Sequence, residues 1–347
     1  MCKIAIITDL HWGKKNDNVL LRNYFMEFFN NTFFPWVESA KPDAIVIPGD
    51  FYDRRKYINF ETLYYVDTEF CQKLNSYNIP VHILLGNHDV YYKSTNKINS
   101  PLLLLSKFNN FIIEDKFRDV DIAGHSFAML PWICPENQAE FEEFLQRTKS
   151  TAAFGHLELK DFEVHRGIKA DEGMPSSALS TFHTVFSGHY HAKSDDGHIF
   201  YLGTPYDMDF SDLYETKGFH CLHPKKGTLE FIPNDQKMFF RLTYDDKDEN
   251  PKFSGSYTNK YVKLVVKHKK SPVNYDKYMK ALYETGPAEV DVVEDLDITN
   301  NDPDAIDETQ DTLSIIFNQI EHNDKVSDKS KMKKLMSDLY TESHDIE

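Results

Sequence analysis

Five short apolar runs in this sequence each end in residues of the kinds that bind metal ions, and this feature constrains the fold most. The runs and the residues after them are Lys3–Thr8 before Asp9 and His11, Ala44–Pro48 before Asp50, Val81–Leu85 before Asn87, His88 and Asp89, Thr151–Phe154 before His156, and Thr184–Phe186 before His189 and His191. Each run has the length and the Val/Ile content of a buried strand. Because ligands bind beyond the carboxyl ends of such strands, we expect these side chains to meet at one rim. The sequence therefore predicts a site for two metal ions.

Helical patterns alternate with these runs. The segments Val19–Ser39, Phe60–Tyr77 and Pro135–Lys149 carry apolar residues at helical spacing. Strands and helices in alternation predict an α/β fold in which helices lie outside the sheets. The runs Phe200–Leu202, Phe219–Leu222 and Thr228–Ile232 are predicted to be closing strands of the same domain, which we place at residues 1–240.

A smaller domain is predicted at residues 255–294. Tyr261–Val266, Asn274–Glu284 and Glu289–Val293 predict a strand, a helix and a strand. An acidic linker follows at residues 295–307, and two amphipathic helices occupy residues 308–342. Their apolar stripes contain Leu313, Ile316, Phe317, Ile320, Leu335, Met336 and Leu339. Isolated helices of about 14 residues are marginal in water, so we expect them to dock on a partner; the alternative is that they fold back on the small domain.

The net charge of −16 is unevenly distributed. Ten acidic residues and no basic ones lie between Glu289 and Asp311, which leaves about −6 for the rest of the chain. The loops after the metal motifs are instead basic and aromatic, and they contain Lys14, Lys15, Arg54, Arg55, Lys56, Tyr91 and Lys93. Cations beside aromatic rings suit a surface that follows a nucleic-acid backbone. The alternative is that these are ordinary solvated loops.

Several classes of protein are excluded by composition. No apolar stretch approaches the roughly 20 residues that span a bilayer, and the N-terminal segment does not resemble a cleavable signal peptide. The four cysteines, Cys2, Cys71, Cys134 and Cys221, lie far apart without a CxxC pair, which excludes a zinc ribbon and indicates reduced thiols. No glycine-rich phosphate loop supports ATP binding by this chain. We expect a cytoplasmic protein, in the host cytoplasm if it is encoded by a phage.

The ligand types fit phosphodiester chemistry. Two divalent ions about 3.5–4 Å apart can hold a phosphodiester and stabilise its leaving oxygen. Histidine with Asp and Asn, and without thiolate, fits manganese, iron or zinc. Asp9 and His11 are two apart and suit one ion, since such residues point the same way on an extended strand. Asn87 offers a neutral oxygen, which leaves the neighbouring His88 free to act on the substrate.

The ordered series D-x-H, G-D, G-N-H-D, G-H and G-H-x-H resembles the calcineurin-like metallophosphoesterase superfamily over about residues 1–235. The segments ITDLHWG, VIPGDFYD, LLGNHD, GHYH and YLGTPY are most similar to SbcD-type nuclease subunits of DNA double-strand-break repair complexes, and the compact size and acidic linker resemble T-even-type phage members. This resemblance implies a metallophosphoesterase sandwich of mixed sheets flanked by helices, with a small capping domain. It also implies terminal helices that bind an SMC-like coiled-coil ATPase. The activity implied is that of a homodimeric DNA exonuclease and endonuclease in recombination, repair and replication.

The resemblance also implies roles for single residues. It assigns Asp9, His11, Asp50 and His191 to one ion, with Asp50 bridging, and Asn87, His156 and His189 to a second ion, both ions being manganese. His88 would orient the scissile phosphate or protonate the leaving 3′ oxygen, a task suited to histidine near neutral pH. Asp53 and Asp89 would fix imidazole or loop orientation, although turn-stabilising aspartates are equally compatible. The other histidines, including His82, His125, His165, His183 and His198, lack motif context and are interpreted as structural or surface residues.

The segment Val19–Ser39 is unusually aromatic, with Tyr24, Phe25, Phe28, Phe29, Phe33 and Phe34. Six large aromatics exceed what one helix face usually buries, so we expect this segment to form the homodimer interface; the alternative is that all six belong to the core.

Two rival functions share the metal motifs. One is a calcineurin-like phosphatase or cyclic-nucleotide phosphodiesterase, and the other is a non-catalytic scaffold. The capping domain and terminal helices favour the nuclease, and the complete set of ligands argues against a scaffold.

Overall fold

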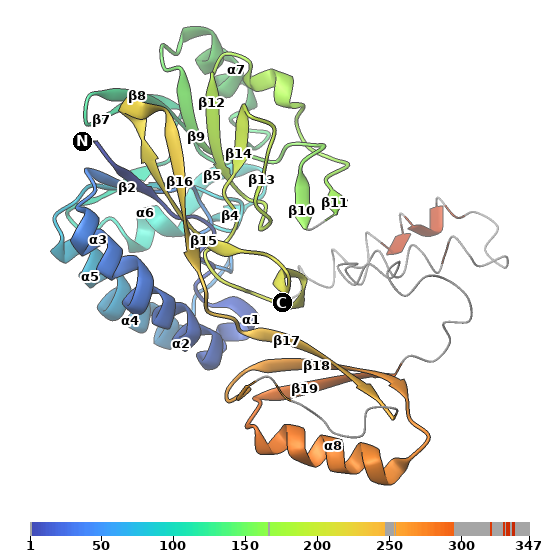
Figure 1. The fold of residues 1–347 in the computed structure, drawn as a ribbon. Coiled ribbons are helices and arrows are strands. Elements are labelled where there is room, and N and C mark those ends of the chain that lie inside the picture. Colours follow the sequence, from blue (N-terminus) through green and yellow to red (C-terminus); the bar gives the residue numbers. More distant parts are fainter. Residues whose placement is uncertain are drawn as a thin grey trace. The chain divides into compact units, whose positions relative to one another are not determined.

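The computed structural model of the protein describes residues 2–165, 167–246, 253 and 255–294, together with residues 320, 329, 331–333, 335 and 336. The chain divides into two compact units, residues 1–294 and residues 295–347. The first unit contains two six-stranded sheets (Figure 1).

The first sheet has the strand order β16-β15-β1-β2-β3-β6. Its strands are β1 (Ile4–Ile6), β2 (Ala44–Ile47), β3 (Val81–Leu84), β6 (Phe111–Glu114), β15 (Lys217–His223) and β16 (Thr228–Asn234). The strands β1, β2, β3 and β6 are parallel, whereas β15 and β16 run antiparallel to their neighbours. The carboxyl ends of β1, β2 and β3 therefore lie at the same edge.

The second sheet has the order β13-β14-β12-β9-β8-β7. Its strands are β7 (Arg118–Ile122), β8 (His125–Leu130), β9 (Ala152–His156), β12 (Thr184–Gly188), β13 (Ser194–Asp195) and β14 (Ile199–Tyr201). The four strands β8, β9, β12 and β14 are parallel, so β8, β9 and β12 also bring their carboxyl ends to one edge. The five predicted strand ends therefore belong to two different sheets.

Side-chain alternation explains why the sheets pack face to face. In β1, Ile4 and Ile6 lie in one core cluster with Phe154 and Phe186 of the second sheet, while Ala5 points to the helical side. Residues one apart on a strand face opposite sides, so a strand that is apolar throughout fits between two layers.

Helices cover the outer faces of both sheets (Figure 1). One continuous helical segment consists of α2 (Val19–Phe28), the π-helical turn η1 (Phe29–Phe33) and α3 (Phe34–Ala40), and a second of α4 (Phe60–Tyr65), η2 (Val66–Cys71) and α5 (Gln72–Ser76). Both segments contribute to the core on the outer face of the first sheet, and α7 (Gln138–Arg147) packs on the second sheet. The predicted sandwich of mixed sheets flanked by helices is confirmed.

The aromatic residues of Val19–Ser39 belong to this core. All six expected interface aromatics, Tyr24, Phe25, Phe28, Phe29, Phe33 and Phe34, are buried within the single chain. For example, the Phe25 ring stacks on Tyr206 with ring centroids 3.8 Å apart. The expected dimer surface on this segment is therefore wrong, because the helices pack against the sheet and against a second aromatic layer that the sequence pattern did not reveal.

The small domain contains three parallel strands, in the order β17-β18-β19, and one helix. Its elements are β17 (Phe239–Asp245), β18 (Tyr261–His268), α8 (Pro272–Glu284) and β19 (Glu289–Glu294). The strand β17 was not predicted, because the sequence pattern indicated only a strand, a helix and a strand. It pairs along its length with β18, and its Tyr244 packs in the domain's apolar cluster.

Short elements connect the larger ones. They are α1 (Lys14–Asp17), β4 (Val90–Tyr92), β5 (Thr95–Asn99), α6 (Ser100–Leu104), β10 (Glu163–His165), β11 (Ile168–Lys169), and the 3-10 turns η3 (Ser176–Leu179), η4 (Phe210–Asp212) and η5 (Pro224–Lys226). No helix among the described residues is long and apolar enough to cross a bilayer.

The predicted linker at residues 295–307 lies outside the described residues, as do Leu313, Ile316, Phe317 and Leu339. Three members of the predicted apolar stripes are described. Ile320 is helical and buried, Met336 is helical and half-buried, and Leu335 is helical and exposed.

Candidate dinuclear metal centre

The predicted metal-binding residues converge at one edge of the sandwich. Asp9 and His11 follow β1, Asp50 follows β2, and Asn87 and His88 follow β3 of the first sheet. From the second sheet, His156 ends β9, and His189 and His191 follow β12. The site therefore lies where the carboxyl ends of parallel strands from both sheets meet.

Asp50 occupies the centre of this group and is buried. Its Oδ2 lies 3.6 Å from His11 Nε2 and 3.4 Å from His156 Nε2. Its Oδ1 accepts a hydrogen bond of 2.9 Å from the backbone N–H of His88. One carboxylate thus faces imidazoles on both sides.

The first side of the centre contains Asp9, His11 and His191, each of which offers one ligand atom within 4.8 Å of the others. His11 Nε2 lies 4.0 Å from Asp9 Oδ1 and 3.2 Å from His191 Nε2. Two imidazole nitrogens and a carboxylate oxygen that face one small space form a suitable donor set for a divalent cation.

On the second side, two imidazoles contact the amide oxygen of Asn87. Asn87 Oδ1 lies 2.9 Å from His156 Nε2 and 3.0 Å from His189 Nδ1. His156 Nδ1 lies 2.8 Å from the Pro48 carbonyl oxygen and donates to it. That hydrogen bond fixes the tautomer that leaves Nε2 available as a ligand, the usual arrangement around metal-bound histidine.

Several of these residues have an unusual backbone conformation. Asp9, His11, Asp50 and His189 have φ values of 53°, 46°, 52° and 91°. Positive φ is uncommon for residues other than glycine, and such residues cluster at functional sites where the surrounding structure enforces the strain. These four residues with positive φ all lie at the edge where the strand ends meet.

Two motif glycines are required by close packing around the site. A Cβ on Gly86 would lie 2.1 Å from Asp50 Oδ1, and a Cβ on Gly49 would lie 2.3 Å from His156 Nδ1. Gly49 also has a φ of 93°, which favours glycine. The glycines of the G-D and G-N-H-D motifs therefore make room for the ligand side chains.

Burial controls the ionisation of the site. Burial, and then the charge of Asp50, raises the pKa of Asp9 well above its usual value. Burial also tends to raise the pKa of Asp50, but the surrounding imidazoles His156, His88 and His11 lower it to about 2. Burial lowers the pKa of His189 to about 3, so its imidazole is neutral at pH 7. Neutral imidazoles beside two neighbouring buried carboxylates fit bound divalent cations.

Asp53 and Asp89 support the centre in different ways. Asp53 Oδ1 lies 3.1 Å from His11 Nδ1 and 3.5 Å from Lys14 Nζ, and these neighbours lower the pKa of Asp53 although burial opposes them. Asp89 is buried, and it accepts hydrogen bonds of 3.0 Å and 2.8 Å from the backbone N–H groups of Phe51 and Gly86. Asp53 thus contacts an imidazole, whereas Asp89 joins the loops after β2 and β3 through hydrogen bonds.

His88 lies at the half-buried mouth of the centre. Its Nδ1 lies 2.5 Å from the Asp53 carbonyl oxygen, so Nδ1 is the nitrogen that donates a proton there. Its ring meets His11 edge-on with ring centroids 4.8 Å apart. The Nε2 atom is then the nitrogen that remains for a substrate or an ion.

Trp132 is a residue at the site that the sequence motifs did not indicate. It follows β8, a further strand of the second sheet whose carboxyl end reaches the rim. Its ring centroid lies 6.0 Å from that of His156 and 5.5 Å from that of His189. The apolar run Phe127–Leu130 before Pro131 is the signal that could have indicated this sixth strand end.

Two buried side chains hold the ligand loops through backbone carbonyl groups. Lys217 Nζ donates a hydrogen bond of 3.0 Å to the His191 carbonyl oxygen. Tyr206 Oη donates one of 2.7 Å to the carbonyl oxygen of Leu10, between the two ligands of the first motif. Neither contact is visible in the sequence, since each joins segments that are far apart along the chain.

The predicted DNA-binding loops follow the ligand residues, and several of their cations contact other groups of the chain. Arg54 is held by Asp17 Oδ2 and Asn16 Oδ1, both at 2.6 Å, and Lys14 pairs with Asp53. Lys15 Nζ lies 4.0 Å from Oε2 of Glu289, in the small domain, and 4.2 Å from the centre of the Tyr261 ring. In the same loops, Arg55 Nε donates to a backbone carbonyl at 3.4 Å, Tyr91 is half-buried, and Lys56 and Lys93 are exposed.

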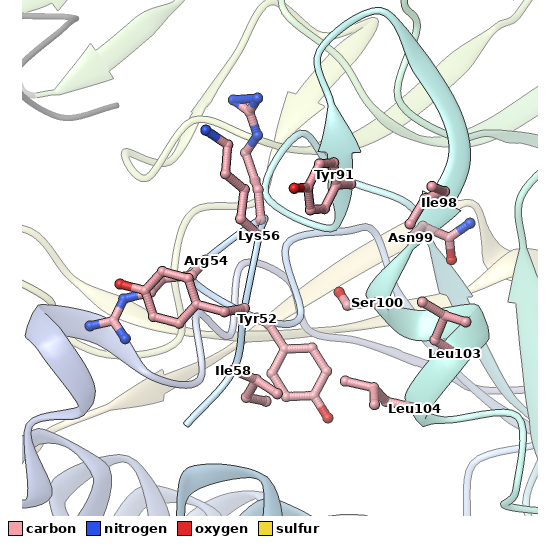
Figure 2. Close-up of a pocket in the computed structure, with 12 residues that line it drawn as sticks. Tyr52, Arg54, Lys56, Ile58, Tyr91, Ile98, Asn99, Ser100, Leu103 and Leu104 are labelled. Atoms are coloured by element: carbon pink, nitrogen blue, oxygen red, sulfur yellow. The ribbon is translucent and has the colours of Figure 1, made fainter. Parts of the chain in front are cut away.

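A pocket of about 160 Å³ lies beside these loops. Figure 2 shows Lys56 and Tyr91 on one side of it and Leu103 and Leu104 on another, with Tyr52 between them. Most of the lining side chains are apolar or aromatic, and the cations come from the loop after β2.

A family model of calcineurin-like phosphoesterases matches residues 2–193, more than half of the chain. The chain belongs to the calcineurin-like phosphoesterase family. This family fold implies a dinuclear site for divalent cations, and the groups around Asp50 supply donors for it.

Three relatives place the chain more narrowly within the phosphoesterase family. Exonuclease subunit 1 of Enterobacteria phage T4 is 30% identical over 76% of this chain and 76% of its own length. The DNA double-strand break repair protein Mre11 of Nanoarchaeum equitans is 25% identical over 70% of this chain and 71% of its own. A subunit of the nuclease SbcCD from Staphylococcus epidermidis is 26% identical over 67% of this chain and 69% of its own. The predicted resemblance to SbcD-type nuclease subunits is confirmed.

Proposed function

We propose that this chain is a metal-dependent nuclease that hydrolyses phosphodiester bonds in DNA, as an exonuclease and an endonuclease, during recombination, repair and replication. The observation that carries the proposal is the Asp50-centred ligand arrangement in a chain that is 30% identical to a phage exonuclease subunit. Its place of action would be the cytoplasm, or the host cytoplasm if a phage encodes it.

The ligand assignment follows the two sides of the centre. Asp9, His11, Asp50 and His191 would hold one ion, and Asn87, His156 and His189 would hold the other together with Asp50. Oxygen and imidazole donors without thiolate suit manganese, which is our proposed metal. Two bound divalent ions supply Lewis-acid chemistry to the scissile phosphate.

His88 would act directly on the substrate. The Asp53 carbonyl holds Nδ1 at 2.5 Å, so the ring cannot turn freely and Nε2 is directed to another partner. From that atom His88 would protonate the leaving 3′ oxygen or orient the phosphate. Asp53 would position His11 by its contact of 3.1 Å.

One assay separates this function from its rivals. Purified chain is incubated with end-labelled duplex DNA, with p-nitrophenyl phosphate and with bis-p-nitrophenyl phosphate, each with manganese or magnesium. A nuclease cleaves the DNA and the diester, a phosphatase cleaves the monoester, and a scaffold cleaves neither. Absence of DNA cleavage with either metal would contradict the proposal.

DNA binding should depend on Lys56, which is exposed in the loop after β2, rather than on Arg54, whose guanidinium pairs with Asp17. Replacing Lys56 with alanine should make the slope of log affinity against log salt shallower by roughly 0.9, since each phosphate contact contributes about that amount. The matched control replaces Lys226, which is also exposed and lies on the β15–β16 turn. An unchanged slope in the first variant would place the DNA path elsewhere.

We propose a homodimer whose interface is a different surface from the aromatic helix. Exposed apolar side chains lie on α4, on α6 and at the pocket shown in Figure 2, which Tyr57, Ile98 and Leu103 help to line. They are Tyr57, Phe60, Tyr64, Ile98, Leu102 and Leu103. Phe60 is 85% exposed, and Tyr64 and Leu103 are each 71% exposed. Apolar surface of this kind commonly marks a protein interface. We name it the α4–α6 surface.

Replacing Phe60 and Leu103 with glutamate should convert the dimer to monomer. An uncompensated charge in an interface costs about 3–5 kcal/mol, so dimerisation should weaken at least roughly 100-fold. Sedimentation of wild type and variant measures this. Val273→Glu is the control, because Val273 is 62% exposed but lies on α8. A wild-type chain that is monomeric at micromolar concentration would contradict the homodimer itself.

We further propose that residues 308–342 bind an SMC-like coiled-coil ATPase. Residues 1–294 form a compact unit without them, which supports a role outside the catalytic unit. Truncation after Asn301 should preserve the melting temperature and the manganese-dependent nuclease activity, while co-purification with the ATPase and ATP-stimulated cleavage are lost. A large fall in melting temperature would instead indicate that these residues stabilise the unit formed by residues 1–294.

A further inference from the structure

The β15–β16 hairpin carries a second group of metal-ligand-type side chains. Cys221 and His223 are two residues apart on β15, and Cys221 is directly opposite Glu230 on β16. Residues two apart on a strand share a face, and directly opposed residues are close neighbours. The antiparallel register therefore places a thiol, an imidazole and a carboxylate together.

The distances between these groups match those in a zinc site. Cys221 Sγ lies 3.6 Å from His223 Nε2, and His223 Nε2 lies 3.2 Å from Glu230 Oε2. The three ligand atoms all lie within 4.8 Å of one another. Tetrahedral zinc, with Zn–S of about 2.3 Å and Zn–N or Zn–O of about 2.0–2.1 Å, spans about 3.5 Å from sulfur to nitrogen and about 3.4 Å from nitrogen to oxygen. The sulfur–nitrogen and nitrogen–oxygen distances therefore match those between ligands of one tetrahedral zinc ion.

We propose that Cys221, His223 and Glu230 bind a zinc ion that is separate from the dinuclear centre. A thiolate combined with imidazole and carboxylate favours zinc over harder cations such as magnesium or manganese. Among the described residues, this is the one group of three such side chains at this spacing that does not adjoin Asp50. The dinuclear centre itself contains no cysteine.

The burial of the three side chains suits entry of an ion from solvent. Cys221 is 1% exposed at the base of the group, whereas the Glu230 side chain is 61% exposed. The open side leaves a fourth position for a water molecule, which would complete a tetrahedral site. Without zinc, the contact between His223 and Glu230 is an ordinary ion pair if the imidazole is protonated.

Binding is balanced by release of one proton. Burial raises the pKa of Cys221 to about 11, so the metal-free protein holds a thiol at neutral pH. On binding, the sulfur–zinc bond forms, the thiol proton leaves to solvent, and His223 ligates through the neutral ring. Because β16 is the edge strand of the first sheet, the ion would fasten that edge to β15.

Cobalt(II) tests the site, because thiolate-bound cobalt has a near-ultraviolet charge-transfer band that nitrogen and oxygen ligands alone do not produce. Metal-free full-length chain is titrated with cobalt(II) in the absence of added thiols. We expect a thiolate band that saturates by three ions per chain, since the dinuclear centre also takes up cobalt, and that disappears when zinc is added. Cys221→Ser should lose the band, whereas Cys134→Ser, a buried cysteine elsewhere in the fold, should keep it.

A second variant protects the test against misfolding of Cys221→Ser. Glu230→Gln changes an exposed side chain on a strand edge and should weaken cobalt and zinc binding roughly tenfold or more, since even indirect partners of metal ligands contribute 10- to 100-fold. Absence of the band in wild type would overturn the proposal. So would a band that survives in a folded Cys221→Ser chain, or an affinity unchanged by Glu230→Gln. None of these outcomes depends on nuclease activity.

Discussion

Replacing Asp50 with alanine is expected to remove metal from the dinuclear centre and to lower DNA cleavage by at least about 10³-fold. Asp50 Oδ2 lies within 3.6 Å of imidazoles on both sides of the centre, which is why we propose it as the ligand shared by both ions. Loss of one preorganised electrostatic group already costs about 10²–10³ in rate, and here the ions are lost as well. Metal analysis of the purified variant and a manganese-dependent cleavage assay measure the two effects.

Two further variants make this result specific. Asp50→Asn keeps the shape and one oxygen but removes the charge, so it should bind metal more weakly than wild type and better than Asp50→Ala. Asp276→Ala removes an exposed aspartate on α8 and should change neither metal content nor cleavage. If Asp50→Ala retained two ions per chain, the bridging assignment would be wrong.

The strand ends could be predicted from sequence because the signal is local. Each ligand lies within a few residues of the end of an apolar run, as Asp50 does after Ala44–Pro48, and the period of a buried strand can be recognised within about five residues. Glycines in the same motifs, such as Gly49, mark close packing that the structure confirms. What the runs could not reveal is that they belong to two sheets, since strand pairing is decided by contacts between distant segments.

Other contacts that the sequence does not reveal have the same physical origin. The aromatic segment Val19–Ser39 has more apolar surface than one helix face can bury, but Tyr206 and Phe219 from far along the chain pack against it. The charge of Arg54 is visible in the sequence, whereas its ion pair with Asp17 is not. Trp132 reaches the centre only because β8 pairs with β9. Local patterns predict elements and ligands, while burial and pairing depend on the tertiary fold.

Replacing His88 with alanine is expected to lower DNA cleavage by about 10²–10⁴-fold while two metal ions remain bound. General acid catalysis by a positioned side chain contributes a factor of this size. The structure places His88 beside the centre, with its backbone N–H bound to Asp50 at 2.9 Å and its Nδ1 held by the Asp53 carbonyl. His125→Ala, a half-buried histidine away from the rim, is the matched control.

The substrate distinguishes the two possible roles of His88. If Nε2 protonates the leaving oxygen, cleavage of bis-p-nitrophenyl phosphate should suffer much less than cleavage of DNA, because nitrophenolate leaves without a proton. If His88 only orients the phosphate, both substrates should slow by similar factors. A metal count that falls in His88→Ala would contradict both roles. The grouping of His88 with His11 and Asp53 within ligand distance makes that outcome a real alternative, and it would reassign His88 as a metal ligand.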